Sequence, residues 1–220
     1  MQANGIADSL PLFEKYKNKI KIIPNGIEIN DLPKWHSKSN SNINRTLNLI
    51  YAGGIDSTRG VDILINAFNE LCNKNINVQL TLIGKKGDYF SDKLKFSNPQ
   101  KVKILSKLSR GDLYLEILKN DLFVYPTKNE GSPRIILEML SIGIPILSTT
   151  LPGIIELDKK KEFINYISNK ESIIKKIIEY KNNPDYFYER ANSGMIHIRK
   201  WNNANQVSKI YEELYSYQES

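Results

Sequence analysis

Short apolar runs rich in β-branched residues alternate with amphipathic stretches along almost the whole chain. The apolar runs predict strands at residues 20–24, 47–52, 78–83, 102–105, 122–126 and 144–148, with a weaker one at 164–167. Helical periodicity predicts helices at 61–71, 112–119, 133–142, 171–180, 186–200 and 203–217. Continuous apolar strands joined by helices are typical of a parallel sheet covered on both faces. The pattern therefore predicts an α/β fold with a doubly wound, Rossmann-like sheet, which binds ligands at the carboxyl ends of its strands.

Composition narrows the class of protein. The chain has 220 residues, 40% hydrophobic and 25% charged, so it can bury a sizeable core and wholesale disorder is excluded. A single cysteine, Cys72, excludes an intramolecular disulfide framework, and its apolar helical setting favours a plain core thiol. No apolar run reaches the roughly 18 residues that span a bilayer, and the first residues lack the order of a signal peptide. We therefore expect a cytoplasmic protein, at most peripheral at the inner face of the membrane.

The charge balance adds little about partners. Lys and Arg number 31 and Asp and Glu 24, a formal net charge of +7. This excess suits phosphorylated ligands, an anionic membrane or nucleic acid, and it equally suits ordinary surface lysines. Because basic and aromatic residues do not interleave on one element, we expect no nucleic-acid partner. His36 lies in a polar loop and His197 on a late helix, and a surface role is favoured for both.

Two glycine-containing loops follow predicted strands. Residues 53–60, GGIDSTRG, lead directly into a helix, so the backbone can approach a ligand and the helix start can offer N–H groups to an anion. Arg59 adds donors that suit phosphate oxygens. Residues 84–87, GKKG, follow the next strand. Each loop is equally compatible with a plain tight turn, so neither identifies a ligand.

The most informative stretch is residues 125–145. Ser132 is expected to be the N-cap of a helix with Pro133 at its first position, and Gly143 is expected to end it. This helix is apolar nearly all round, which is typical of a buried helix. The sequence therefore predicts a buried helix that lies, in chain order, between two strands of the sheet.

Three polar residues on that helix, Arg134, Glu138 and Ser141, have i, i+4, i+7 spacing and share one face. Glu130 lies on the loop before the helix. In a structural interpretation, Arg134 and Glu138 form an ordinary ion pair and Glu130 is a loop acid. In a functional one, two carboxylates flank a helix N-terminus that binds phosphate and accept hydrogen bonds from a polyol. The spacing alone does not decide between them.

The run EGSPRIILE from Glu130 to Glu138 resembles the E-x7-E signature of glycosyltransferase family 4 (group 1), which are retaining, metal-independent enzymes of the GT-B fold. The resemblance extends from about residue 20 to residue 216. Other segments follow the family's order: PNGI at 24–27, a diphosphate loop within 51–68, TLIG at 81–84, VKIL at 102–105, GIIE at 153–156, and Trp201 and Tyr211 near the last helix.

The resemblance implies a role for each site residue. Glu130 would contact hydroxyls of the transferred sugar, Arg59 would replace the family's usual lysine on the diphosphate, and Glu138 would hold the ribose. The remaining donor-binding residues would be Gly53, Gly54, Gly131, Ser132, Pro133 and Arg134. Neither a metal nor another cofactor is implied, and the sequence has no Asp-x-Asp motif. The implied partners are a UDP- or GDP-linked sugar donor and a saccharide or lipid-linked acceptor.

Two departures from the family pattern matter. Members often carry arginine at the position of Gly54, so one phosphate-binding cation is missing. We expect residues 1–19 to be only a remnant of, or linker to, the family's N-terminal acceptor domain. We expect a nucleotide-sugar-binding domain at 20–200 and a C-terminal crossing helix at 201–220, which would dock an N-terminal half or self-associate. The alternative function is a non-catalytic nucleotide-sugar-binding module, or one subunit of a split transferase.

Overall fold

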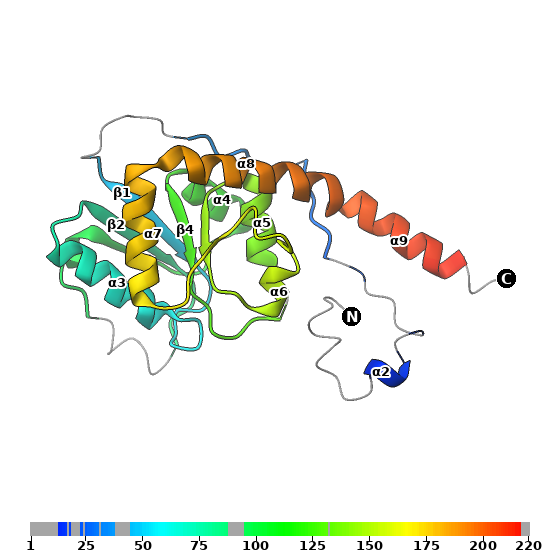
Figure 1. Ribbon diagram of the computed structural model, residues 1–220, viewed down its shortest axis with the longest axis horizontal. Helices are drawn as coiled ribbons and strands as arrows, with labels where there is room; N and C mark the ends of the chain where they lie inside the picture. The colour runs from blue at the N-terminus through cyan, green and yellow to red at the C-terminus, as the bar shows by residue number, and fades with distance from the viewer. Residues whose placement is uncertain are drawn as a thin grey trace.

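The computed structural model describes residues 13–16, 18, 23, 25–30, 32–37, 45–87, 95–131 and 133–216. Six strands form one parallel sheet (Figure 1) in the order β3-β2-β1-β4-β5-β6. Their bounds are β1 Leu47–Ala52, β2 Val78–Ile83, β3 Val102–Leu105, β4 Leu122–Tyr125, β5 Ile146–Ser148 and β6 Asn165–Tyr166. The predicted Rossmann-like parallel sheet is confirmed. Its order reverses between β1 and β4, where a doubly wound sheet binds its ligands.

Helices cover both faces of the sheet. In chain order, the helices of the described residues are α2 Phe13–Tyr16, α3 Val61–Asn73, α4 Arg110–Leu118, α5 Arg134–Ile142, α6 Pro152–Ile155, α7 Lys170–Asn182, α8 Pro184–Trp201 and α9 Ala204–Ser216, with a 3-10 turn at Pro99–Lys101. Right-handed crossovers from β1 to β2 and from β4 to β5 run in opposite directions, which puts α3 and α5 on opposite faces. Helix α7 contacts α3, and α8 contacts α5. The two layers enclose one apolar core centred on the strands.

The apolar pattern explains which strands were predicted well. The bounds of β1, β2 and β3 agree with the prediction. The predicted strand 122–126 ends one residue earlier and 144–148 begins two residues later, because Pro126 and Pro145 lack the N–H that a parallel ladder needs. The weak strand shrinks to β6, and α6 and the 3-10 turn were not predicted. Most of the predicted strand 20–24 lies outside the described residues.

The segment before the sheet meets the segment after it. Ile27 forms a parallel bridge with Asn203, and its N–H donates to the carbonyl oxygen of Asn202 at 2.8 Å. The N–H of Ala204 donates back to Ile27 at 2.9 Å. From this bridge α9 continues beyond α8, away from the sheet (Figure 1). Both ends of the sheet domain are therefore fixed at one place.

Candidate functional site

The loops that follow β1 and β4 meet at the carboxyl end of the sheet, where the strand order reverses. The β1–α3 loop covers residues 53–60, and the β4–α5 loop runs from residue 126 to Pro133. The N–H of Lys128 donates to the carbonyl oxygen of Thr58 at 3.2 Å, and Lys128 Nζ lies 3.1 Å from Asp62 on α3. Segments about 70 residues apart in sequence therefore form one surface at the expected position for a ligand.

Local hydrogen bonds give the β1–α3 loop its shape. The carboxylate of Asp56 accepts from the Thr58 hydroxyl and from the N–H of Arg59 at 3.0 Å. The Tyr51 hydroxyl donates to the carbonyl oxygen of Gly54 at 2.7 Å. These contacts fix the backbone on both sides of the loop's centre and so determine where the Arg59 side chain starts.

Two glycines let other backbone segments approach the β4–α5 loop closely. Gly60 has a φ of 67°, in the left-handed region, and a Cβ there would lie 1.9 Å from the carbonyl oxygen of Pro126. A Cβ on Gly153, in α6, would lie 1.7 Å from the carbonyl oxygen of Gly131. Because Gly60 and Gly153 have no side chains, their backbones can pack against the beginning and the end of the β4–α5 loop.

The glycine loop at 84–87 packs against the β1–α3 loop. Ile55 forms a bridge with Lys86, its N–H donates to the carbonyl oxygen of Lys85 at 2.9 Å, and its own carbonyl oxygen accepts from Gly87 at 3.1 Å. These bonds show a structural role for the loop, in supporting residues 53–60.

Arg59 and Glu130 form an ion pair across the two loops. Arg59 Nη1 donates to Glu130 Oε2 and also to the carbonyl oxygen of Asn129 at 3.1 Å. Burial disfavours the charge on Arg59, but the Glu130 carboxylate more than offsets this effect, so the pKa of the guanidinium lies above its ordinary value. The Tyr125 hydroxyl donates to the same Oε2 at 2.9 Å. One carboxylate oxygen thus joins the loops to the end of β4.

Glu138 lies one turn inside α5 and is 5% exposed. Its Oε1 lies 3.1 Å from Arg110 Nη2, at the start of α4, and 3.4 Å from Arg134 Nε. Tyr114 also forms a hydrogen bond with this carboxylate. Burial raises the pKa of Glu138, and the two arginines and Tyr114 offset only part of the effect. The structure therefore holds a buried acid between two exposed cations at the edge of α5.

The start of α5 differs from the prediction by one residue. The helix begins at Arg134, with Pro133 as its N-cap at φ −74° and ψ 95°, so Pro133 at the first helical position was wrong. The predicted N-cap, Ser132, lies outside the described residues. The helical hydrogen bonds begin with the N–H of Ile136, which donates to Pro133. Gly143 ends the helix with a φ of 86°, as expected.

The structure brings most of the predicted site residues together. Gly53 and Gly54 lie in the β1–α3 loop beside Arg59, while Gly131 follows Glu130 directly. Of the polar face on α5, Arg134 and Glu138 pair with each other. Ser141 does not share their surroundings: its hydroxyl is buried and has no hydrogen-bond partner among the described residues.

Sequence reasoning missed the groups that hold the two acids, namely Tyr125 for Glu130 and Arg110 with Tyr114 for Glu138. Tyr51, the penultimate residue of β1, and Tyr125, the last residue of β4, lie on neighbouring strands at the switch point and stack with ring centroids 5.9 Å apart. A tyrosine near the end of each of two predicted strands was a usable signal. No local signal marks Arg110, because its contact depends on the packing of α4 against α5.

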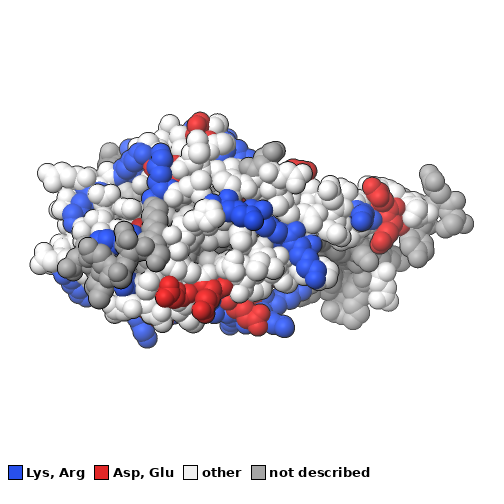
Figure 2. All heavy atoms as spheres, turned by 90° about the horizontal axis from the view of Figure 1, so that it is seen from above, with Lys and Arg blue, Asp and Glu red and all other residues white. Residues whose placement is uncertain are grey.

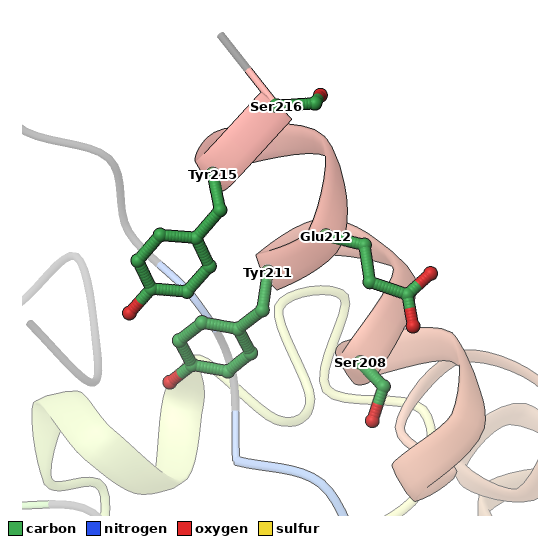
Figure 3. A pocket seen from close by; sticks show the side chains of 5 residues that line it. All are labelled: Ser208, Tyr211, Glu212, Tyr215 and Ser216. Atoms are coloured by element: carbon green, nitrogen blue, oxygen red, sulfur yellow. The ribbon is translucent and has the colours of Figure 1, made fainter. Parts of the chain in front are cut away.

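Outside this site, α9 carries an exposed aromatic face. Val207 of this helix is buried, whereas Tyr211 and Tyr215 are exposed, as is Trp201 at the end of α8. The rings of Tyr211 and Tyr215 extend to the same side of the helix (Figure 3). They border an open hollow of about 520 Å³ whose other lining residues are Ser208, Glu212 and Ser216.

The single cysteine and the two histidines have ordinary surroundings. Cys72 is half-buried, and burial raises the pKa of its thiol, in agreement with a plain core thiol. His36 is exposed, and the ring of His197 lies against Phe163 with centroids 5.0 Å apart. Among the described residues, no three His, Cys, Asp or Glu side chains are grouped so as to hold a metal ion.

Lys and Arg side chains are spread along the face seen in Figure 2, while Asp and Glu gather in a few smaller groups. The basic residues on this face therefore do not form one continuous patch. No helix in the described ranges is both long and apolar enough to cross a membrane.

The parallel sheet and the loops at its switch point define a Rossmann-like domain of the GT-B glycosyltransferase type. The chain belongs to the family "Glycosyl transferases group 1", whose sequence model matches residues 33–194.

It is 25% identical to the Staphylococcus aureus capsular polysaccharide biosynthesis glycosyltransferase CapM over 152 residues, 64% of this chain and 40% of CapM. A Rickettsia africae glycosyltransferase structure superposes with a TM-score of 0.78 at 16% identity, covering 97% of this chain and 61% of that one. Anabaena HepE, in complex with UDP and glucose, superposes with a TM-score of 0.73 at 19% identity, covering 89% of this chain and 57% of HepE. The chain spans less than half the length of the curated relatives that it matches.

Proposed function

We propose that this chain is the nucleotide-sugar-binding domain of a retaining, metal-independent glycosyltransferase. Residues 20–200 would form the donor site, and residues 201–220 would contact an acceptor-binding half. The observation that carries the proposal is the meeting of Arg59 and Glu130 across the switch point, with Glu138 buried one turn into α5. The structure of HepE with UDP and glucose gives a precedent for such a donor on this fold.

Each acid is assigned to a different part of the donor. Glu130, on the loop beside Arg59, would accept hydrogen bonds from hydroxyls of the transferred sugar. Glu138 would accept from the ribose hydroxyls, because two of the donors to its carboxylate, Arg110 and Arg134, are exposed, and one of them can be exchanged for a ligand hydroxyl. Gly53, Gly54 and Gly131 would let the donor approach the backbone.

The site must stabilise the negative charge that appears on the leaving diphosphate during the reaction. Cleavage of the bond between sugar and phosphate oxygen leaves a negative charge on the nucleoside diphosphate, and preorganised donors there lower the barrier. Arg59 supplies a permanent cation, and the N–H groups of Arg134 and Ile135 precede the first hydrogen bond of α5. Because these groups can stabilise the negative charge on the leaving diphosphate in place of a metal ion, we propose that no metal is required.

The acceptor assignment is broader. We propose a saccharide or lipid-linked acceptor, because CapM is named for capsular polysaccharide biosynthesis. The acceptor would be held by a region of the longer family members that this chain does not span. We propose a cytoplasmic location, at most peripheral to the membrane.

Calorimetric titration of the full chain with UDP, GDP and transfer RNA tests the donor assignment. We expect binding of one nucleoside diphosphate and none of the RNA. Glu138→Gln should weaken diphosphate binding by about 1.5–3 kcal/mol, because the ribose loses a charged acceptor. Glu130→Gln should leave diphosphate binding nearly intact while weakening the sugar-linked donor. The matched control is Glu116→Gln, another buried acid, which pairs with Lys103 on the edge strand β3 and with Lys119 at the end of α4, and should leave both affinities unchanged.

Equal losses of diphosphate affinity in the Glu130 and Glu138 variants would contradict the two assignments. The second candidate function is a nucleotide-sugar-binding module without transfer activity, or one subunit of a split transferase. Transfer of radiolabelled sugar by this chain, measured with and without an acceptor-binding half from a relative, separates the two candidates. Retention is tested by the anomeric configuration of the product.

A further inference from the structure

Glu130 receives two donors on one oxygen. Arg59 Nη1 and the Tyr125 hydroxyl both donate to Oε2, the latter at 2.9 Å, and the described residues make no hydrogen bond to Oε1. The side chain is 20% exposed, so the carboxylate reaches solvent from a partly buried position. One oxygen is therefore held by the protein, and the other accepts no hydrogen bond from the described residues.

Tyr125 is a rigid donor. It is the last residue of β4 and 3% exposed, and its ring stacks on Tyr51 and on Phe123, with centroids 5.9 Å apart in each case. Burial and the nearby Glu130 raise the pKa of this phenol, so the hydroxyl keeps its proton and donates throughout the working pH range. Arg59, by contrast, lies on a loop, and its side chain is 35% exposed.

The two donors have different fates when a donor molecule binds. Under the proposed function, Arg59 directs its charge to the diphosphate, which removes or weakens its bond to Glu130. The Tyr125 hydroxyl does not depend on the ligand and remains on Oε2. We propose that Tyr125 is a positioning residue that keeps Glu130 directed at the sugar hydroxyls while Arg59 holds the diphosphate. This inference rests on the proposed function.

The test uses the full chain and Tyr125→Phe, which removes the hydroxyl and keeps the ring in its stack. For a panel of UDP- and GDP-linked hexoses, calorimetry gives the sugar gain, defined as the Kd of the free diphosphate divided by the Kd of its sugar-linked form. We expect the variant to lose about fivefold or more of this gain, with an unchanged Kd for the free diphosphate. The matched control, Tyr166→Phe, removes a hydroxyl that donates to Asp158 at 3.2 Å next to the edge strand β6, and should leave the gain unchanged.

A second measurement separates positioning from general damage. If Tyr125 acts through Glu130, Tyr125→Phe should change the sugar gain little in a Glu130→Gln background, so the two effects are not additive. Additive effects, an unchanged gain in Tyr125→Phe, or an equal loss for diphosphate and sugar donor would each overturn the inference and leave the proposed function standing. A wild-type chain that binds no diphosphate would overturn the proposed function and the inference together. Diphosphate binding without a gain from any sugar would overturn the role of Glu130 and, with it, this inference.

Discussion

Replacing Gly60 by alanine should open the contact between the β1–α3 and β4–α5 loops. The new Cβ would lie 1.9 Å from the Pro126 carbonyl oxygen, whereas real Cβ atoms stay at least 3.0 Å from such a neighbour, so the backbone must move by about 1 Å. Alanine at a φ of 67° also costs about 1 kcal/mol more than glycine. Displacement of packed backbone costs about 1–3 kcal/mol. We expect a loss of about 2–4 kcal/mol in the free energy of unfolding.

Thermal unfolding followed by circular dichroism measures this loss, and for a chain of this size it corresponds to a fall of roughly 5–15 °C in Tm. The matched control is Gly111→Ala, since a Cβ at Gly111 in α4 meets nothing within 4 Å. That variant should gain about 0.4–1 kcal/mol from the stiffer unfolded chain. Diphosphate affinity should fall in Gly60→Ala alone, because the Pro126 end of the binding loop moves. Equal shifts of Tm in the two variants would refute the reasoning.

Three further predictions concern the site and α9. Arg59→Ala should weaken binding of the nucleoside diphosphate much more than of the nucleoside, by calorimetry, and EDTA should change neither; a strong magnesium requirement would count against this site. Burial raises the pKa of Glu138, and ribose needs the ionised form, so diphosphate affinity should fall on acidification with a midpoint above the ordinary glutamate value. That step should be missing in Glu138→Gln, which corrects for titration of the ligand's own phosphate. Replacing Tyr211 and Tyr215 by serine should reduce self-association in sedimentation, because it removes exposed aromatic surface from α9. A strictly monomeric wild-type chain would contradict this prediction.

The sequence predicted the parts of this fold that depend on local patterns. Apolar runs with polar neighbours define β1, β2 and β3 to the residue, because the largely buried strands β1 and β2 must end where polar loops begin, and the partly exposed edge strand β3 is still apolar at three of its four positions. Errors at β4 and β5 come from Pro126 and Pro145, which are apolar in the pattern and yet cannot donate to the ladder. The edge strand β6 has only two residues and too little burial for a clear pattern.

For the site, too, the sequence predicted the features that depend on local patterns and not those that depend on long-range contacts. The sequence identified Arg59, Glu130 and Glu138 through their places on a loop and a helix. It did not identify what each acid binds, because the pairing of Arg59 with Glu130 joins residues 71 positions apart. The contact of Arg110 with Glu138 likewise depends on where α4 packs. Residue types and spacing are properties of the local chain. The partners, in contrast, come together only when the crossover connections place distant segments side by side in the fold.

The bridge between Ile27 and Asn203 has a practical consequence for engineering. Because the incoming and outgoing chains run parallel and are joined by two hydrogen bonds, both ends of the domain leave from a single anchor point. Residues 27–203 can therefore be exchanged between relatives as one unit. A chimera needs to match the geometry of the neighbouring chain only at this bridge, where both connections lie. Any rotation of an attached polypeptide about this point must turn both connections together, so the anchor acts as a single pivot.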